Sequence, residues 1–220
     1  MRAFNDIYTI AVTRKGSPES VKYQVHGPKP PAEIAQIPEA DWLAAFSGAI
    51  FSTGLNWRVV ENKWPDILAA YKGFDVNACA MMDDGWFDEL MSDPRIIRNG
   101  AKVTSVRDNA VFLQSLRAQG GAGQVFGEWP ATDFIGLLAL MKKHGARIGG
   151  TTGQYALRKM GVDSFILSKD VVARLIAEGV IDKPPTSKKA MAAVQEAFNT
   201  WMAQSGRSLT EVCRVLALSV

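Results

Sequence analysis

The chain has 220 residues, of which 47% are hydrophobic and 21% are charged, which is typical of a globular protein with a core of its own. The 25 lysine and arginine residues outnumber the 22 aspartate and glutamate residues by three, so the charge permits a local basic patch without requiring one. No apolar run approaches the roughly 18 residues of a membrane span, and we expect no secretion signal. Two cysteines exclude a disulfide framework and a four-cysteine metal site, so we expect a reducing, cytoplasmic compartment.

Apolar side chains recur at helical spacing along most of the chain. The spacing and the positions of Ser, Thr, Asp, Gly and Pro predict where helices begin and end. The predicted helices cover residues 42–50, 64–73, 95–98, 103–116, 132–145, 152–160, 170–179, 187–201 and 208–218.

Period-two alternation is nearly absent, with residues 21–25 as the one weak candidate for a strand. Residues 26–40, which hold four prolines, and the segment 120–130 are predicted to be irregular. The sequence therefore predicts an all-α fold of two helical lobes around a cleft. We expect residues 1–40 to form an N-terminal segment that packs on a helical domain of residues 41–220.

The segment 142–157 combines a helix end, a glycine-containing turn and the start of a second helix. Glycine lets a backbone turn sharply, and the free N–H groups at the start of the second helix can bind a phosphate. Lys142, Lys143 and Arg147 add positive charge beside the turn. The pattern indicates sequence-independent contact with a DNA backbone. An ordinary connection between helices, capped by glycines, is the alternative that the spacing alone leaves open.

This segment resembles the helix-hairpin-helix element of the 3-methyladenine DNA glycosylase I family, which carries G-x-x-x-x-G-T-T followed by a tyrosine. The matching residues are Gly145, Gly150, Thr151, Thr152 and Tyr155.

Other blocks agree in the same order along the chain. Residues 51–57, F-S-T-G-L-N-W, resemble the family's F-Q-A-G-L-S-W, and Phe74-Asp75 resembles its F-D-P. Residues 95–103, followed by Asn109-Ala110, resemble its I-I-R-x-x-x-K-I block with N-A. The resemblance covers about residues 46 to 162, over half of the chain.

The resemblance implies a bilobal helical fold that flips a damaged base out of duplex DNA and cuts its N-glycosidic bond. Trp57 matches the pocket tryptophan of the family, and Phe51, Asn56 and Tyr155 are predicted as its neighbours, with core packing as the alternative for Phe51 and Tyr155. Predicted DNA contacts are Gly145, Arg147, Gly149, Gly150, Thr151, Thr152, Lys143, Arg98 and Lys102. A solvated charged surface is the alternative for Arg98 and Lys102.

The sequence also departs from the family. Ala49 stands where the family has a pocket glutamate, and the family's N-terminal Y-H-D-x-E-W-G segment is missing. The family's zinc ligands, two Cys and two His near the chain ends, are also missing. The only histidines, His26 and His144, cannot complete a four-ligand zinc site. We therefore predict no structural metal and no cofactor.

A catalytic carboxylate is predicted from the wider superfamily, which includes 3-methyladenine DNA glycosylase II and endonuclease III. In those proteins an aspartate opens the helix that follows the hairpin. Asp170 follows Gly149 by 21 residues at such a helix start, and a plain helix cap is its alternative role. Asp163 is a weaker candidate. The lysine nucleophile of bifunctional enzymes would fall at Thr151, so we expect no lyase step.

These inferences predict a monofunctional DNA glycosylase that acts, as a monomer, on double-stranded DNA containing an alkylated purine such as 3-methyladenine. Two alternatives stay open. One is a protein that binds DNA lesions without cleavage, which Ala49 would explain. The other is a helical interaction domain with no nucleic-acid role, for which DNA binding would be weak and insensitive to salt.

Overall fold

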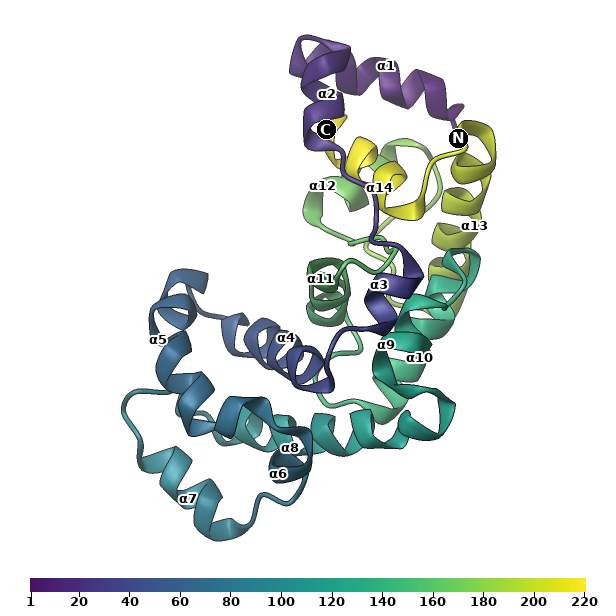
Figure 1. Cartoon of the computed structure of the whole chain (residues 1–220). Helices are drawn as coiled ribbons and strands as arrows, with labels where there is room; N and C mark the ends of the chain where they lie inside the picture. The colour runs from purple at the N-terminus through teal and green to yellow at the C-terminus, as the bar shows by residue number, and fades with distance from the viewer. The chain divides into compact units, whose positions relative to one another are not determined.

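The computed structural model describes all 220 residues, and every regular element in it is helical (Figure 1). The all-α class predicted from the apolar spacing is confirmed. The elements are α1 (Phe4–Lys15), α2 (Pro18–Gln24), α3 (Pro31–Ala35), α4 (Glu39–Ser52), α5 (Trp57–Ala70), η1 (Lys72–Phe74), α6 (Val76–Ala80), α7 (Asp84–Ser92), α8 (Gly100–Ser115), η2 (Arg117–Gln119), α9 (Gly121–Gly127), η3 (Ala131–Asp133), α10 (Phe134–His144), α11 (Thr151–Met160), α12 (Lys169–Ala177), α13 (Lys188–Ser205) and α14 (Leu209–Leu218). None of these helices combines the length and the apolar character that a bilayer crossing demands.

The chain forms two compact units. The first unit comprises residues 1–29, 129–137 and 161–220, and the second comprises residues 30–128 and 138–160. Each unit is therefore assembled from segments that are distant in sequence. The boundaries between these units do not fall at residue 40. The division into an N-terminal segment, residues 1–40, and a helical domain, residues 41–220, stays a prediction.

In the first unit, α14 packs against α1, α12 and α13. The aromatic rings of Phe165 and Phe198 stack with their centroids 5.0 Å apart, and Trp201 meets Phe198 edge-on. All three side chains are fully buried, so they form the apolar centre that the surrounding helices share.

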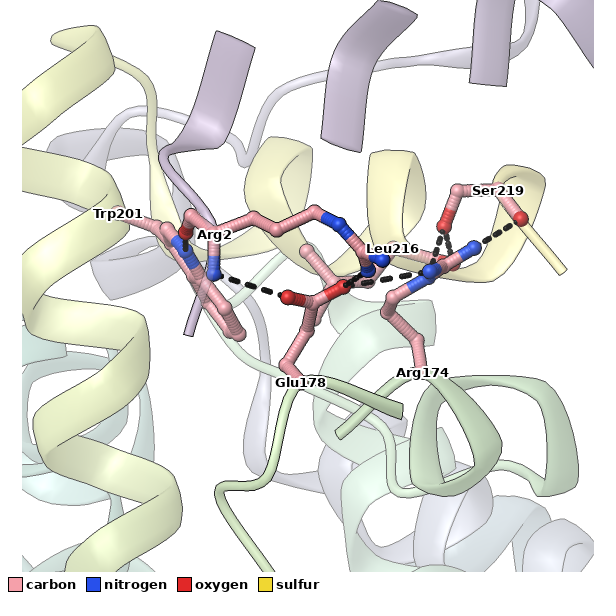
Figure 2. A network of polar contacts seen from close by, with 6 residues as sticks. All are labelled: Arg2, Arg174, Glu178, Trp201, Leu216 and Ser219. Atoms are coloured by element: carbon pink, nitrogen blue, oxygen red, sulfur yellow. Dashed lines mark hydrogen bonds and ion pairs between the residues drawn. The ribbon is translucent and has the colours of Figure 1, made fainter. Parts of the chain in front are cut away.

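A polar network around the buried Glu178 carboxylate joins both ends of the chain to the end of α12 (Figure 2). The backbone N–H of Arg2 and its guanidinium donate to the Glu178 carboxylate at 2.9 and 2.7 Å. Arg174 donates to the same carboxylate at 3.3 Å and to the hydroxyl and carbonyl oxygens of Ser219. The indole N–H of Trp201 donates to the carbonyl oxygen of Arg2 at 3.1 Å. Glu178 is thus the common acceptor for two arginines.

In the second unit, α4 contacts α5, α8, α9 and α11. Trp42 and Phe46 of α4 surround Phe126 of α9, with ring centroids 4.9 and 6.0 Å from it. The three rings are buried, so α4 is fixed at its N-terminal half by aromatic packing.

Helix α5 differs from the prediction, because it begins at Trp57 and holds Pro65 in its interior. The cap is provided by Asn56, whose side chain accepts a hydrogen bond at the start of the helix. Proline in a helix interior removes one backbone hydrogen bond. Val60 and Ile67 are buried on either side of Pro65, so tertiary packing maintains the helix across it.

Two further local predictions are wrong. Residues 21–25, expected as a weak strand, lie in and directly after α2, whose start is capped by the Ser17 hydroxyl. Residues 95–98, expected as a short basic helix, lie in a turn and loop. There the guanidinium of Arg95 pairs with Asp93 at 2.8 Å, a local interaction that competes with helix formation.

The two segments that were expected to be irregular also contain helices. Residues 26–40 include α3 and the start of α4, and residues 120–130 include α9. Gly123 explains how α9 and α3 pack, because a Cβ atom there would lie 2.6 Å from the Ile34 carbonyl oxygen. Glycine at this position allows the close approach of two backbones, which sequence periodicity does not reveal.

The Glu178 network predicts a pH-dependent contribution to stability. Burial raises the pKa of the Glu178 carboxyl, but the hydrogen bonds from Arg2 and Arg174 outweigh burial and hold its pKa below the usual value. A lowered folded-state pKa stabilises the fold fully above the unfolded-state pKa, about 4.3, and this contribution is lost as the pH falls through the folded-state pKa. We expect Glu178→Gln to lower the free energy of unfolding in urea by about 2 kcal/mol at pH 7.

The difference between wild type and Glu178→Gln should shrink as the pH falls below about 4.3, because the protonated carboxyl resembles the amide. Glu196→Gln, at an exposed position of α13, is the matched control and should change stability little at any pH. A constant difference between wild type and Glu178→Gln from pH 7 to pH 3 would contradict this account.

Candidate functional site

A pocket of about 830 Å³ lies within the second unit, among α4, α5 and α11. Helix α4 contributes small side chains, α5 contributes two indole rings, and α11 contributes its first two turns and Lys159. The lining residues are Ala45, Gly48, Ala49, Ser52, Thr53, Trp57, Val60, Glu61, Trp64, Pro65, Thr151, Thr152, Tyr155, Ala156 and Lys159. A volume of this size accommodates a small organic ligand.

Three aromatic side chains line the pocket. Trp57 is 58% exposed and Tyr155 is 52% exposed, which is unusual for rings of this size. Trp64 packs over Gly48, where a Cβ atom would lie 3.3 Å from the indole ring. Exposed aromatic surface that is concentrated in a concave site indicates ligand binding.

The structure separates the four residues predicted for the pocket. Trp57 and Tyr155 line it. Phe51 does not, because it is 1% exposed and its ring lies 5.9 Å from that of Tyr71 in the core. Asn56 does not line it either, because its side-chain oxygen accepts the Arg58 N–H and caps α5.

Among the lining residues that were not predicted, Glu61 and Lys159 carry charges and Trp64 carries an indole ring. The signal for Glu61 and Trp64 is present in the sequence, since Trp57, Glu61 and Trp64 follow one another at helical spacing. Placing the helix start at Pro65 concealed it.

The hairpin predicted over residues 142–157 is formed by the end of α10, a turn and the start of α11. Glycines are required where backbones meet, because a Cβ atom on Gly149 would lie 2.5 Å from that of Lys142. A Cβ atom on Gly153 would lie 2.0 Å from the Ile148 carbonyl oxygen. In the first turn of α11, the N–H groups of Gly153 and Gln154 donate to the Gly150 carbonyl oxygen at 3.0 and 3.2 Å. Those of Thr151 and Thr152 have no acceptor within the helix, which makes this turn suited to bind an anion.

Asn109 of α8 holds the hairpin turn through two hydrogen bonds. Its amide donates to the Ala146 carbonyl oxygen at 3.0 Å, and its side-chain oxygen accepts the Ala146 N–H at 2.8 Å. Asn109 is fully buried, so this pairing has no competition from water. The N-A block of the sequence therefore has a structural role in shaping the turn.

The predicted DNA-contacting cations differ in their surroundings. Lys143 and Arg147 in the hairpin and Arg98 in the loop before α8 are exposed. Lys102 is 8% exposed, and its amine donates to the carbonyl oxygens of Phe51 and Thr53 at 3.0 and 2.7 Å. Burial, and to a lesser degree the charge of Arg147, lowers the pKa of the Lys102 amine. Lys102 is therefore committed to the protein interior rather than to a phosphate.

The predicted catalytic residue, Asp170, is exposed in the first turn of α12, in the first unit. The helix cap is Ser168, whose hydroxyl accepts the Val171 N–H at 3.3 Å, so Asp170 is not used as the cap. Asp163 accepts the N–H groups of Leu209 and Thr210 at 3.2 and 2.7 Å, which engages it at the start of α14.

The donor set does not fit a structural metal. No group of three or more His, Cys, Asp or Glu side chains lies together in the structure. Cys79 belongs to the second unit and Cys213 to the first, and both are buried.

The two hydrogen bonds between Asn109 and Ala146 predict that the hairpin turn loosens when they are removed. Asn109→Ala removes both hydrogen bonds to Ala146, so we expect the free energy of unfolding to fall by about 1–3 kcal/mol. Amide hydrogen exchange across the turn, residues 145–150, should accelerate, as measured by mass spectrometry. Asn62→Ala, at an exposed position of α5, is the control. Unchanged exchange in the turn of Asn109→Ala would contradict the role of Asn109.

Comparison with known proteins gives one family and two solved structures. Residues 44–129 match the family described as methyladenine glycosylase. A structure of a Tyr-to-Phe variant of 3-methyladenine DNA glycosylase I in complex with 3-methyladenine is 14% identical, with a TM-score of 0.51 over 70% of this chain and 90% of that chain. A second structure of 3-methyladenine DNA glycosylase I is 19% identical, with a TM-score of 0.46 over 66% of this chain and 87% of that one. No curated protein matches the chain.

The matched segment includes α5, α8 and most of α4, which supply two walls of the pocket and the side chains that hold its turns. Residues 44–129 therefore resemble the methyladenine glycosylase family, and the chain has the all-α fold of 3-methyladenine DNA glycosylase I, as its sequence blocks predicted.

Proposed function

We propose that this protein is a monofunctional DNA glycosylase that acts as a monomer on double-stranded DNA and hydrolyses the N-glycosidic bond of an alkylated purine such as 3-methyladenine. One observation carries the proposal. Thr151 and Thr152, whose backbone N–H groups have no acceptor within α11, also line the aromatic pocket. A site for a DNA phosphate and a site for a base are therefore adjacent on one element.

The pocket chemistry suits a base taken out of the DNA stack. A flipped base needs aromatic surfaces to replace the stacking that it loses, and Trp57, Trp64 and Tyr155 offer them. Methylation at N3 or N7 of a purine in DNA gives the base a positive charge, which the faces of indole rings attract. The pocket therefore has the features that binding of such a base requires.

Hydrolysis requires a group that activates water. The C1′–N bond breaks and the base leaves with the bonding electrons, which neutralises its positive charge. The oxygen of water bonds to C1′, and a carboxylate accepts the proton that this water loses. The same negative charge stabilises the cationic sugar in the transition state. We assign this role to Asp170, whose carboxylate is exposed and is not used as a helix cap.

Base release tests the activity directly. Wild type, incubated with methylated duplex DNA, should release 3-methyladenine, measured by chromatography. We expect Asp170→Asn to lower the rate by at least about 100-fold, the lower range for loss of a general base. Asp182→Asn, at another exposed carboxylate of the first unit, is the control and should retain the rate.

Each alternative has its own outcome. Release that is unaffected in Asp170→Asn would assign catalysis to another group. No release by a folded wild type that binds DNA would contradict hydrolysis and would favour a protein that recognises lesions without cleaving them.

The hairpin proposal is tested by the salt dependence of duplex binding, measured by fluorescence anisotropy. Each phosphate contact contributes about −0.9 to the slope of log K against log salt concentration. Arg147→Ala should make the slope less negative by about 0.9, since it removes one contact. Arg14→Ala, an exposed arginine of α1, is the matched control and should leave the slope unchanged. Binding that is insensitive to salt would contradict a nucleic-acid role.

A further inference from the structure

Glu61 is the one acidic residue that lines the aromatic pocket. It lies on α5 one turn after Trp57 and one turn before Trp64, so the three residues share one face of the helix. The Glu61 side chain makes no hydrogen bond and no ion pair in the structure, unlike Glu39, Glu178 and Glu211. Its charge is therefore available to a ligand.

The other walls carry no negative charge. Helix α4 lines the pocket with Ala45, Gly48, Ala49 and Ser52, none of which can be ionised. Helix α11 contributes one charged side chain, Lys159, which makes no ion pair. The pocket thus has a negative charge on its α5 wall and a positive charge on its α11 wall.

This polarity discriminates between ligands in a way that the aromatic rings alone cannot. Indole and phenol rings stack on any purine, whether it is alkylated or not. The guanidinium of Arg58 lies 5.7 Å from the centre of the Trp57 ring, within the range of a cation–π interaction. A carboxylate between the two tryptophans adds a charge that favours a cationic base and gives no such advantage to a neutral one.

We propose that Glu61 determines the specificity of the pocket for positively charged, alkylated purines. The proposal rests on the proposed function in taking a damaged base as the ligand. On this basis Lys159, on the opposite wall, suits the anionic phosphate of the flipped nucleotide rather than the base. Glu61 acts on the choice of ligand and is not assigned a part in breaking the glycosidic bond.

Binding of free nucleosides tests Glu61 without any requirement for catalysis. The probes are N7-methylguanosine, which is cationic at pH 6, and guanosine, its neutral parent. Binding is measured by the quenching of tryptophan fluorescence. Wild type should prefer N7-methylguanosine. Glu61→Gln should bind it about fivefold more weakly, the effect of one solvent-exposed ion pair, with guanosine affinity unchanged.

Two control variants make the result specific. Glu61→Asp keeps the charge and should retain most of the preference. Lys159→Met removes the other charge of the pocket and, since a nucleoside has no phosphate, should not weaken binding of N7-methylguanosine. Both substituted positions are exposed, so all of these variants should fold like wild type, as judged by circular dichroism.

Three outcomes would overturn the proposal: no preference for the cation in wild type, a preference that Glu61→Gln retains, or an equal loss in Lys159→Met. The outcome for base release is separate. Release of 3-methyladenine without a Glu61-dependent preference would leave the proposed function and remove the role of Glu61. A Glu61-dependent preference without base release would leave a selective pocket in a protein that does not cleave.

Discussion

The pocket depends on the hydrogen bonds of one buried group, the amine of Lys102. It donates to the carbonyl oxygens of Phe51 and Thr53, at the end of α4, where a helix leaves its last carbonyls without partners. A positive charge is also favourable there, because the helix dipole makes that end negative. The turn that follows leads directly to Trp57, so Lys102 fixes the point at which the aromatic wall of α5 begins.

Helix α8 also holds the opposite wall of the pocket, α11, again through a buried side chain that forms hydrogen bonds with backbone atoms. Asn109 lies seven residues after Lys102, two helical turns along the same face, and pairs with the backbone of Ala146 in the hairpin turn. One helix therefore positions both the turn before α5 and the turn before α11. Lys102 and Asn109 are buried and hydrogen-bonded, whereas Trp57 and Tyr155 are half exposed. The exposed rings of the pocket are therefore carried by walls whose supports are buried and hydrogen-bonded.

Some parts of this arrangement can be predicted from short-range sequence patterns, whereas others depend on contacts between residues that are distant in sequence. Helices with a strong apolar period and a clear cap, such as α8, α11 and α13, were predicted to within a few residues. The start of α5 was wrong because Pro65 suggested a first turn, whereas buried neighbours keep it inside the helix. The role of Lys102 was also wrong. A lysine in a basic block suggests a surface contact, and only the packing of α4 against α8 reveals that it is buried. Short-range patterns report helices, but burial depends on partners that are distant in sequence.

The residues proposed for recognition and the residue proposed for hydrolysis lie in different parts of the chain. The pocket, the hairpin and their supports all belong to the second unit, whereas Asp170 belongs to the first. The first unit is built from three separate segments, and Glu178 ties Arg2, near the N-terminus, to Arg174 of the helix that carries Asp170. Substitutions in that network can therefore affect α12 without altering the pocket. The proposed selectivity for a cationic base and the proposed cleavage are therefore assigned to different units, so we expect substitutions to separate them.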